Sequence, residues 1–340
     1  MNGKEKLYNI VIAPNGAYTK YALVLLNSLF ETNSDKRFRI FVLYNSLTEE
    51  EKAMISKFVK ERNSIIEYIH VNEGKYRVFQ WKNRFSVETY FRLEIQDVLP
   101  REVERALYLD IDMIICSDIS ELYNLDFENK YMAACGFSPY CERGDEFNAG
   151  MILFNMEKMR RDITFDTYTD LAKKLRGEFY QDQGLLNAQF GDDGTKYVWK
   201  QKYNFTCAFY RKYMEEVLKE DPDFSLNDVV VLHYPGPGIR PWQALITQEE
   251  YERFVKNNLL ELFSLKGYLI DELYVEVQRK WWDFAERTPV YADLLAEMNR
   301  SKSLILEEVL IAAVNAKDYQ LGKKILKIPR IIKKVCGRKQ

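Results

Sequence analysis

Two aspartates separated by one residue, Asp110 and Asp112, are the side chains of this sequence best placed to do chemistry. They follow a short apolar segment at residues 107–109, which predicts a buried strand. Residues i and i+2 leaving a strand point to the same side, so the two carboxylates can share one cation. Hard oxygen ligands suit magnesium or manganese, and such an ion would bridge to a diphosphate. The alternative is that one of the two only caps the turn that follows.

His233 is the candidate third ligand. The sequence has two histidines, and this one ends an apolar segment and enters a turn rich in glycine and proline. An imidazole nitrogen at a strand end is well placed to bind a metal ion. In the same turn Gly236 and Gly238 would let the backbone approach a phosphate, and Arg240 would neutralise its charge. The alternative is a packed histidine beside a surface arginine. For the other histidine, His70, we prefer the interpretation as a packed residue without a metal.

These residues need a sheet to bring them together, and the first half of the chain predicts one. Apolar runs typical of buried strands alternate with segments of helical spacing. The predicted fold class is therefore α/β, with right-handed crossovers and a doubly wound, mostly parallel sheet. In such a sheet ligands bind at the carboxyl ends of the strands. The predicted strands cover residues 7–13, 38–43, 65–71, 107–109, 151–154 and 229–232, and the predicted helices or amphipathic segments cover 18–30, the segment capped by Ser46 or Thr48, 156–175 and the stretch from Gln181.

The composition and the apolar pattern of the sequence change after Trp242. Residues 246–340 are rich in Glu, Lys and Leu and predict helices, with a break at Pro289. We expect a first domain, with the candidate site, over residues 1–245 and a helical region over residues 246–340.

The last segment has a basic amphipathic pattern. Residues 323–340 contain eight Lys or Arg and no acidic residue, and apolar residues recur at helical spacing from Leu321 to Val335. A basic amphipathic helix binds an anionic membrane surface, so we expect peripheral docking through this tail. A solvated or packed terminus is the alternative.

Composition narrows the class of protein. The chain has 340 residues with 49 basic and 51 acidic side chains, and its net charge of −2 argues against a nucleic-acid partner. Its five cysteines form no CxxC pair, which disfavours a disulfide framework. No apolar run approaches the roughly 20 residues of a spanning helix. The apolar start at residues 10–13 is too short for a signal peptide. We expect a cytoplasmic protein, peripheral on the inner face of the membrane where the tail docks.

Several motifs, in chain order, resemble those of glycosyltransferase family 8, the retaining, metal-dependent sugar-nucleotide transferases with a GT-A fold. An ordered set of this kind is far more specific than any single motif. The similarity spans roughly residues 7 to 245 and is greatest to bacterial lipopolysaccharide galactosyl- and glucosyltransferases. The matching elements are the opening strand with its turn at Ala13, Tyr90-Phe91-Arg92, the segment from Leu107 to Asp112, Phe147-Asn148-Ala149-Gly150, Tyr180-Gln181-Asp182-Gln183 and His233-Tyr234-Pro235-Gly236.

The resemblance implies roles for individual residues. Asp110, Asp112 and His233 would bind Mn²⁺, or Mg²⁺, together with the diphosphate of a UDP-sugar. Arg92 would contact the donor sugar or the diphosphate. The donor would be UDP-galactose or UDP-glucose, and the acceptor a glycan or glycolipid. The residues implied to contact the donor are Ala13, Asn15, Tyr18, Asp110, Ile111, Asp112, Asn148, Gly236 and Arg240, with Asn148, Asp182 and Gln183 around the sugar.

A mechanism follows from these roles. The sugar leaves through an oxocarbenium-like transition state while charge builds on the β-phosphate. A divalent cation and Arg240 would stabilise the leaving group. Asp182 is the nearest candidate nucleophile for a retaining reaction. The resemblance instead implies same-face attack, with Gln183 beneath the anomeric carbon and Asp182 orienting the sugar.

The sequence departs from the family pattern in three places. The first turn has Asn15 and Ala17 where Asp and Asn are frequent, so uridine contacts there are weaker or different. The turn after His233 is one residue longer and has Arg240 for Lys, which binds phosphate as a fork rather than a point charge. Gly136-Phe137 replaces an acidic acceptor-side residue, which leaves the acceptor open.

Residues 74–85, basic and aromatic, resemble a mobile lid that closes over the donor, and an ordinary surface loop is the alternative. Two other functions compete with the transferase. A phosphohydrolase of the haloacid dehalogenase type also uses Asp-x-Asp after a strand, with Asp192-Asp193 as its later acidic motif. A catalytically silent sugar-nucleotide binder would keep the site without turnover.

Overall fold

The structure is a computed structural model that describes residues 6–79, 86–136, 146–179, 181–198, 200–236, 240–243, 246–264 and 270–315. Its internal contacts divide the chain into two compact units, Met1–Pro235 and Gly236–Gln340. This division falls ten residues before the domain boundary expected near residue 245. The two units are considered separately below.

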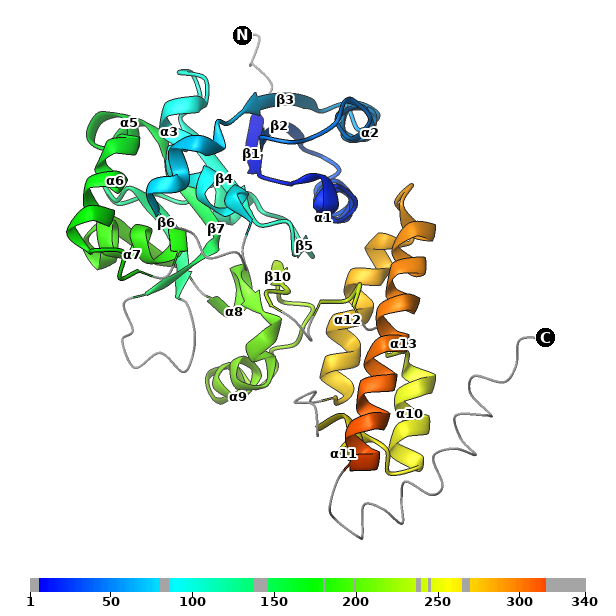
Figure 1. Ribbon diagram of the computed structural model, residues 1–340. Coiled ribbons are helices and arrows are strands. Elements are labelled where there is room, and N and C mark those ends of the chain that lie inside the picture. The colour runs from blue at the N-terminus through cyan, green and yellow to red at the C-terminus, as the bar shows by residue number, and fades with distance from the viewer. Residues whose placement is uncertain are drawn as a thin grey trace. The chain divides into compact units, whose positions relative to one another are not determined.

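A seven-stranded sheet forms the centre of the first unit (Figure 1). Its strand order is β3-β2-β1-β4-β7-β6-β8. All neighbouring pairs are parallel except those that β7 makes with β4 and β6, so β7 alone runs against the other strands. The predicted fold class, α/β with a mostly parallel sheet, is confirmed. The strands are β1 (Leu7–Ile12), β2 (Arg37–Tyr44), β3 (Ile65–His70), β4 (Arg105–Leu109), β6 (Met132–Gly136), β7 (Phe147–Asn155) and β8 (Thr195–Val198).

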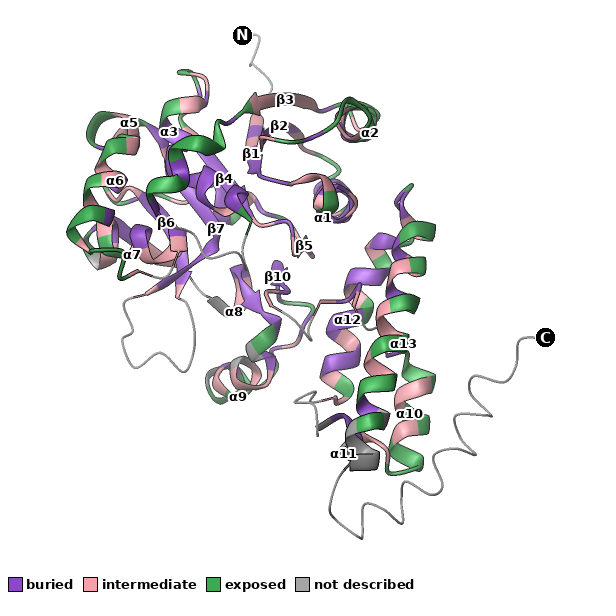
Figure 2. Cartoon of the chain, viewed as in Figure 1, coloured by how far each residue is buried: buried purple, intermediate pink, exposed green. Residues whose placement is uncertain are grey.

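The sheet reverses its direction of winding at β1. The chain moves outward from β1 to β2 and β3, then returns to place β4 on the other side of β1. A crevice at the carboxyl ends of the strands is expected at such a switch point. Ile10, Val11 and Ile12 are fully buried because both faces of this central strand are covered, which explains the continuous apolar run in the sequence (Figure 2).

Helices lie beside both halves of the sheet (Figure 1). The helix α2 begins with the predicted capping box, in which Thr48 and Glu51 satisfy each other's backbone N–H groups. The amphipathic segment 156–175 is two helices, because Ile163 is extended and Thr164 starts a new helix. The helices of this unit are α1 (Thr19–Thr32), α2 (Glu49–Lys60), α3 (Ile95–Val98), α4 (Ser120–Asn124), α5 (Met156–Asp162), α6 (Phe165–Lys174), α7 (Gln181–Gly194), α8 (Lys200–Tyr203) and α9 (Tyr210–Glu220), with 3₁₀ helices η1 (Gly16–Tyr18), η2 (Glu73–Phe79), η3 (Val87–Glu94) and η4 (Cys207–Phe209).

A second, three-stranded sheet lies next to the end of β4. It contains β5 (Met113–Ile115), β10 (Val231–His233) and β9 (Phe205–Thr206), in the order β5-β10-β9. Its register places His233 opposite Met113 on β5 and opposite Thr206 on β9. The pairing therefore brings His233 beside the residue that follows Asp112.

The described part of the second unit is helical, as the sequence predicted. It contains α10 (Gln248–Lys256), α11 (Leu260–Ser264), α12 (Glu272–Ala285) and α13 (Tyr291–Asn315). Pro289 lies in the break between α12 and α13. The fully buried Trp281 packs against Trp242, and Trp282 donates its indole N–H to the carbonyl of Pro241 at 3.1 Å.

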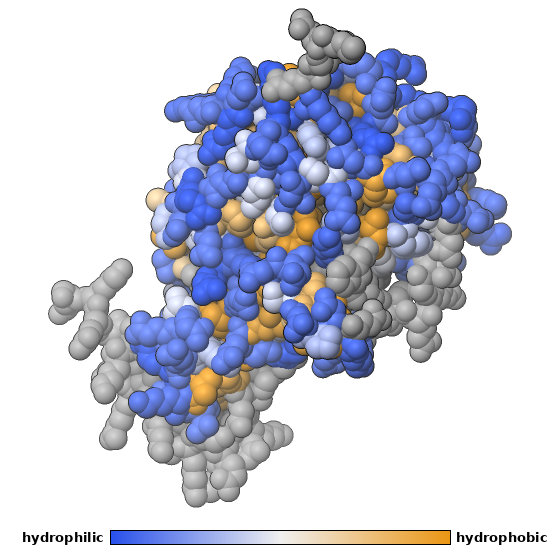
Figure 3. All heavy atoms as spheres, turned by 180° about the vertical axis from the view of Figure 1, so that it is seen from behind, coloured by the Kyte–Doolittle hydropathy of each residue, from blue (hydrophilic) through white to orange (hydrophobic). Residues whose placement is uncertain are grey.

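The tail with its basic amphipathic pattern, residues 323–340, lies outside the described residues. None of the helices that the structure describes combines the length and the apolar character that crossing a membrane requires. Hydrophilic residues cover most of the face seen in Figure 3, and hydrophobic residues form smaller areas among them.

Candidate active site

Asp110, Asp112 and His233 meet at the point where β4 leaves the main sheet. The Nε2 atom of His233 lies 3.2 Å from Oδ1 of Asp112 and 3.9 Å from Oδ2 of Asp110. The backbone contributes to this meeting, since the Tyr234 N–H donates to the Asp112 carbonyl at 2.8 Å. One ligand atom from each of the three side chains lies within 4.8 Å of the other two. The residues that the sequence separated by more than 120 positions therefore form one cluster.

The donor set of this cluster fits a divalent cation. It offers two carboxylate oxygens and one imidazole nitrogen, the ligand types that manganese accepts and that magnesium accepts in part. The His233 side chain is 3% exposed, but those of Asp110 and Asp112 are 26% and 14% exposed. The cluster is thus open on the carboxylate side, where a nucleotide phosphate could complete the coordination.

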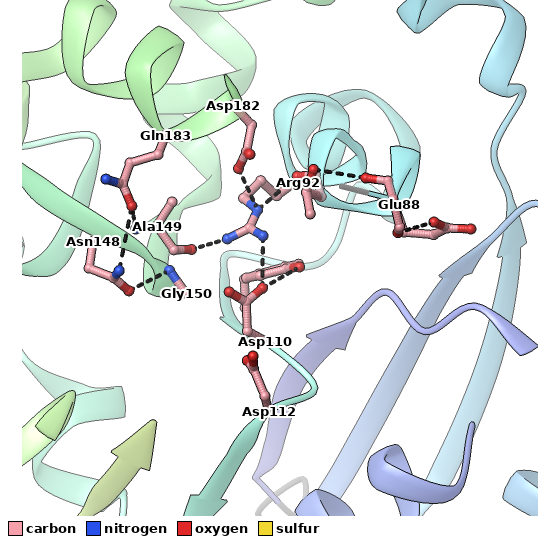
Figure 4. A network of polar contacts seen from close by, with 12 residues as sticks. Glu88, Arg92, Asp110, Asp112, Asn148, Ala149, Gly150, Asp182 and Gln183 are labelled. Carbon is pink, nitrogen blue, oxygen red and sulfur yellow. Dashed lines mark hydrogen bonds and ion pairs between the residues drawn. The ribbon is translucent and has the colours of Figure 1, made fainter. Parts of the chain in front are cut away.

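Arg92, on η3, contacts both Asp110 and Asp182 in the interior of the site (Figure 4). Its guanidinium donates to Oδ1 of Asp110 at 2.7 Å and makes an ion pair with Oδ2 of Asp182 at 3.0 Å. It also donates to the carbonyls of Thr89 and Ala149. The residue is 2% exposed and stacks over Tyr108. These contacts fix the guanidinium in place, and the donor contact that the resemblance implied for Arg92 stays a prediction.

Burial and neighbouring charges shift the pKa values of Asp110, Asp182 and Arg92. Burial raises the pKa of the Asp110 carboxyl, Arg92 opposes that rise, and the neighbouring Asp112 adds to it. Burial likewise raises the pKa of Asp182 to about 6, again against the opposing charge of Arg92. Burial lowers the pKa of Arg92, but the carboxylates outweigh burial and leave that pKa above its ordinary value. Arg92 is therefore the fixed positive charge of the site.

The start of β7 presents Asn148 and the backbone beside it to the same place. Between Ala134 and Cys135 of β6 the register on β7 jumps from Ile152 to Asn148, which leaves an irregular segment between them. Within it, Gln183 accepts the Ala149 N–H at 3.2 Å, and Asn148 donates to Gln183 at 3.5 Å. The resemblance placed Asn148, Asp182 and Gln183 around one sugar, and the structure brings these three residues together (Figure 4).

A side chain at position 150 would press against the neighbouring side chains. A Cβ atom there would lie 2.5 Å from Cε1 of His233, 2.8 Å from Cε of Met113 and 2.9 Å from Oδ1 of Asn148. The Gly150 carbonyl also accepts the Asp110 N–H at 2.8 Å. The missing side chain lets β7 and the histidine ring approach each other closely.

The other predicted donor residues are distributed around this centre. Ala13 and Asn15 follow the carboxyl end of β1, next to β4, and Asn15 caps η1 by accepting the Tyr18 N–H at 3.2 Å. Tyr18 packs edge-on against Tyr21. Ile111 is 8% exposed, and its expected contact with the donor stays a prediction.

Gly236 and Arg240 belong to the second unit. Gly236 has φ of +84°, a left-handed conformation that favours glycine. Arg240 lies over the ring of Trp242. Their expected contact with the diphosphate stays a prediction from the sequence.

Part of the predicted lid is described by the structure. Residues 74–79 fall within η2, where Tyr76 and Phe79 are buried and Tyr76 donates its hydroxyl to Glu94. Residues 80–85 lie outside the described residues, and so does Phe137 of the Gly136-Phe137 pair. The lid's movement and the acceptor site stay predictions.

Comparison with known proteins decides the family. Residues 9–245 match the family model described as glycosyl transferase family 8. The chain belongs to glycosyltransferase family 8. A putative glycosyltransferase of Haemophilus influenzae is 24% identical over 300 residues, which cover 83% of this chain and 84% of the relative. Glycosyltransferase GlyF of Streptococcus pneumoniae is 23% identical, but the match covers 69% of this chain and only 57% of GlyF.

Solved structures agree on the fold. The galactosyltransferase LgtC, crystallised with donor and acceptor sugar analogs, has a TM-score of 0.65 at 23% identity, over 83% of this chain and 96% of LgtC. GlyE of Streptococcus pneumoniae has a TM-score of 0.58 at 22% identity, over 85% of this chain and 63% of GlyE. The GT-A fold is therefore confirmed, and the chain is a glycosyltransferase of family 8.

Sequence reasoning missed two members of the site. Asn204 is 1% exposed and contacts both His233 and Asn148, yet nothing in its local sequence distinguishes it. Tyr108 donates its hydroxyl to Asp110 at 3.1 Å, whereas the sequence indicated it as part of the strand and of the matching segment without a role of its own. A polar atom at a buried strand position was the available signal for Tyr108, because such an atom needs a partner.

Proposed function

We propose that this family 8 enzyme transfers galactose or glucose from a UDP-sugar to a glycan or glycolipid acceptor, with retention of configuration at the anomeric carbon. The observation that carries the proposal is the convergence of Asp110, Asp112 and His233 at the switch point of the sheet, with ligand atoms within 4.8 Å. That geometry suits a cation bound to the diphosphate of a nucleotide sugar.

Asp110, Asp112 and His233 would hold Mn²⁺, or Mg²⁺ in its place. When bound, the ion supplies positive charge where negative charge develops on the leaving diphosphate. Arg92 orients Asp110 through its 2.7 Å contact, and its positive charge favours the ionised carboxylate that a metal ligand needs. Ala13, Asn15 and Tyr18, beyond the neighbouring end of β1, would bind the uridine.

Retention is proposed to follow same-face attack rather than a covalent intermediate. The Asp182 side chain is 4% exposed and is paired with Arg92, which makes it a poor nucleophile and a good orienting group for the sugar. Gln183 has its amide oxygen fixed by the Ala149 N–H at 3.2 Å. A fixed amide oxygen can stabilise positive charge on the anomeric carbon without moving during the reaction.

The tail is proposed to hold the enzyme on the inner face of the membrane, near a lipid-linked acceptor. The support is its sequence, with eight basic residues and no acidic one between 323 and 340. Removal of residues 321–340 should weaken binding to vesicles that contain anionic lipid and leave turnover of soluble donor intact. Equal vesicle binding by the two chains would contradict the docking role.

A thermal-shift panel tests the donor and the metal together. UDP-galactose, UDP-glucose and UDP are each added with and without Mn²⁺, and a ligand of the native state raises the melting temperature by mass action. We expect a metal-dependent shift with uridine nucleotides that Asp112→Ala abolishes. The absence of any metal-dependent shift would refute the proposed donor.

Turnover then separates the transferase from the alternatives. Release of UDP in the presence of acceptor, with an anomeric proton coupling that shows retention, supports the proposal. Binding of donor without any release of UDP would identify a silent binder. The phosphohydrolase loses its support, because Asp110 follows the fourth strand of the chain and the chain belongs to family 8.

A further inference from the structure

Asn204 is a buried amide that links the metal-binding cluster to the sugar-binding residues. It directly precedes β9 and is 1% exposed. Its Nδ2 donates to Oδ1 of Asn148 at 2.9 Å, and its Oδ1 lies 3.0 Å from Nδ1 of His233. Both ends of the side chain are therefore engaged, and each end contacts a residue of the candidate site.

Backbone N–H groups fix which side-chain atom donates and which accepts in this series of hydrogen bonds. The Gly150 N–H can only donate, and it meets Asn148 at 2.9 Å, so the Asn148 atom at that place must be the acceptor Oδ1. The Ala149 N–H in the same way fixes Gln183 with its oxygen toward Asn148, whose NH₂ donates to it. Asn204 must then present its NH₂ to Asn148 and its oxygen to His233.

The orientation of the Asn204 amide determines which nitrogen of the His233 ring carries the proton. An amide oxygen cannot donate, so Nδ1 of His233 must carry the proton in this contact. In the neutral ring the lone pair then lies on Nε2, the nitrogen that faces Asp112 at 3.2 Å and Asp110 at 3.9 Å. A lone pair directed at two carboxylates is suited to a cation between them. Without the Asn204 oxygen, the opposite tautomer would be favoured, with Nε2–H donated to Asp112.

We propose that Asn204 is a positioning residue that holds His233 in the Nδ1–H tautomer and thereby keeps Nε2 free to bind the divalent cation. Through the same side chain it connects the ligand to Asn148, so the orientation of the metal ligand and of the sugar-binding amide are set together. The proposal rests on the metal role of His233 in the proposed function. Mutation of a residue that hydrogen-bonds to a metal ligand typically lowers metal affinity by about 10- to 100-fold.

Imidazole nitrogen NMR tests the tautomer without any activity assay. The chain has only His70 and His233, so a ¹⁵N-histidine sample gives two ring patterns, and a His70→Gln variant assigns them. Without metal, at about pH 8.5, where an ordinary histidine is neutral, we expect a proton on Nδ1 of His233 in the wild type. In Asn204→Ala we expect the Nε2–H pattern instead. An unchanged pattern in this variant would overturn the proposal.

Metal affinity gives the second readout. Titration with Mn²⁺ should show a dissociation constant about 10- to 100-fold higher for Asn204→Ala. Asn204→Asp keeps an acceptor toward Nδ1 and loses the donor to Asn148, so it should retain the Nδ1–H pattern and bind Mn²⁺ at least as tightly as the wild type. Asn33→Ala, which removes another amide that is 1% exposed but lies at the end of α1, is the matched control and should bind Mn²⁺ normally.

The outcomes separate the two proposals. If Mn²⁺ fails to broaden the His233 resonances of the wild type, the proposed function loses its metal site, whatever Asn204 does. If Mn²⁺ broadens them but Asn204→Ala binds Mn²⁺ with wild-type affinity, only the role of Asn204 is refuted. Asn204→Asp keeps the test decisive where the alanine variant does not fold, because loss of the Nδ1–H pattern in the aspartate variant also contradicts the proposal.

Discussion

Replacement of Gly150 by alanine tests whether close approach of β7 to His233 sets the geometry of the site. The added Cβ would lie 2.5 Å from Cε1 of His233, whereas ordinary van der Waals contact begins at 3.4 Å. The ring or the strand would therefore have to move by 0.9 Å, the difference between these two distances, to restore ordinary contact. The strand is held by the Gly150 carbonyl, which accepts the Asp110 N–H at 2.8 Å, so we expect much of the movement in the ring.

A movement of this size is large compared with the tolerance of a binding site. The Nε2 atom of His233 lies 3.2 Å from Asp112, and displacing it changes the distance between two of the three ligands. A misplacement of about 1 Å can reduce catalysis about 100-fold. Overpacking of this kind also costs about 1–3 kcal/mol of unfolding free energy. We therefore expect Gly150→Ala to lower kcat/KM by roughly two orders of magnitude and to weaken Mn²⁺ binding.

Gly177→Ala is the matched control. Gly177 has φ of +75° with open space around its Cβ position, so alanine there strains the backbone without touching the site. It should destabilise the fold by about 1–3 kcal/mol and leave Mn²⁺ affinity unchanged. Isothermal titration with Mn²⁺ and UDP-release kinetics compare the two variants. Wild-type Mn²⁺ affinity and turnover in Gly150→Ala would refute the steric reasoning.

Three further predictions address the rest of the fold and site. Arg92→Lys should lower the unfolding free energy by about 3 kcal/mol, because a point charge cannot serve the buried Asp182, the partly exposed Asp110 and two carbonyls at once; a denaturant titration with an unchanged midpoint would argue against this. Burial raises the pKa of Asp182 from its ordinary value of 3.8 to about 6 in the folded state, so its contribution to stability is present below pH 3.8 and is lost as the pH rises through 6. From pH 4 to pH 7 the stability of the wild type relative to Asp182→Asn should therefore fall by up to about 3 kcal/mol, measured by unfolding at each pH, and a relative rise would contradict the sign. Thr48→Ala should remove the capping box of α2 at a cost of about 1 kcal/mol without affecting Mn²⁺ binding, and a loss of metal affinity would show coupling that the structure does not contain.

Much of the fold was predictable because its signals are local. The strand at residues 7–12, the capping box at Thr48 and the helical spacing after residue 246 each depend on neighbours within a few positions. The division of residues 156–175 into two helices was not predicted. It depends on the extended backbone at Ile163, and the apolar periodicity continues across that break.

The candidate site was predictable in its residues and not in its connections. Asp110 and Asp112 are adjacent to a strand, and His233 ends one, so their types and positions indicated a ligand set. The sequence did not indicate that Asp110 and Asp182 both pair with the guanidinium of Arg92. Those ion pairs and the 2% exposure of Arg92 depend on how η3 packs against the sheet.

By itself, the sequence determined the alternation of strands and helices and the presence of an acidic pair at a strand end. Those features follow from apolar periodicity and backbone capping, which act over a few residues. Only the tertiary structure decided which side chains meet: the register of β5 with β10 brings His233 to Asp112, and β9 brings Asn204 to His233. Such contacts join residues far apart in the chain, and their geometry depends on the packing of the whole sheet, which no local pattern records.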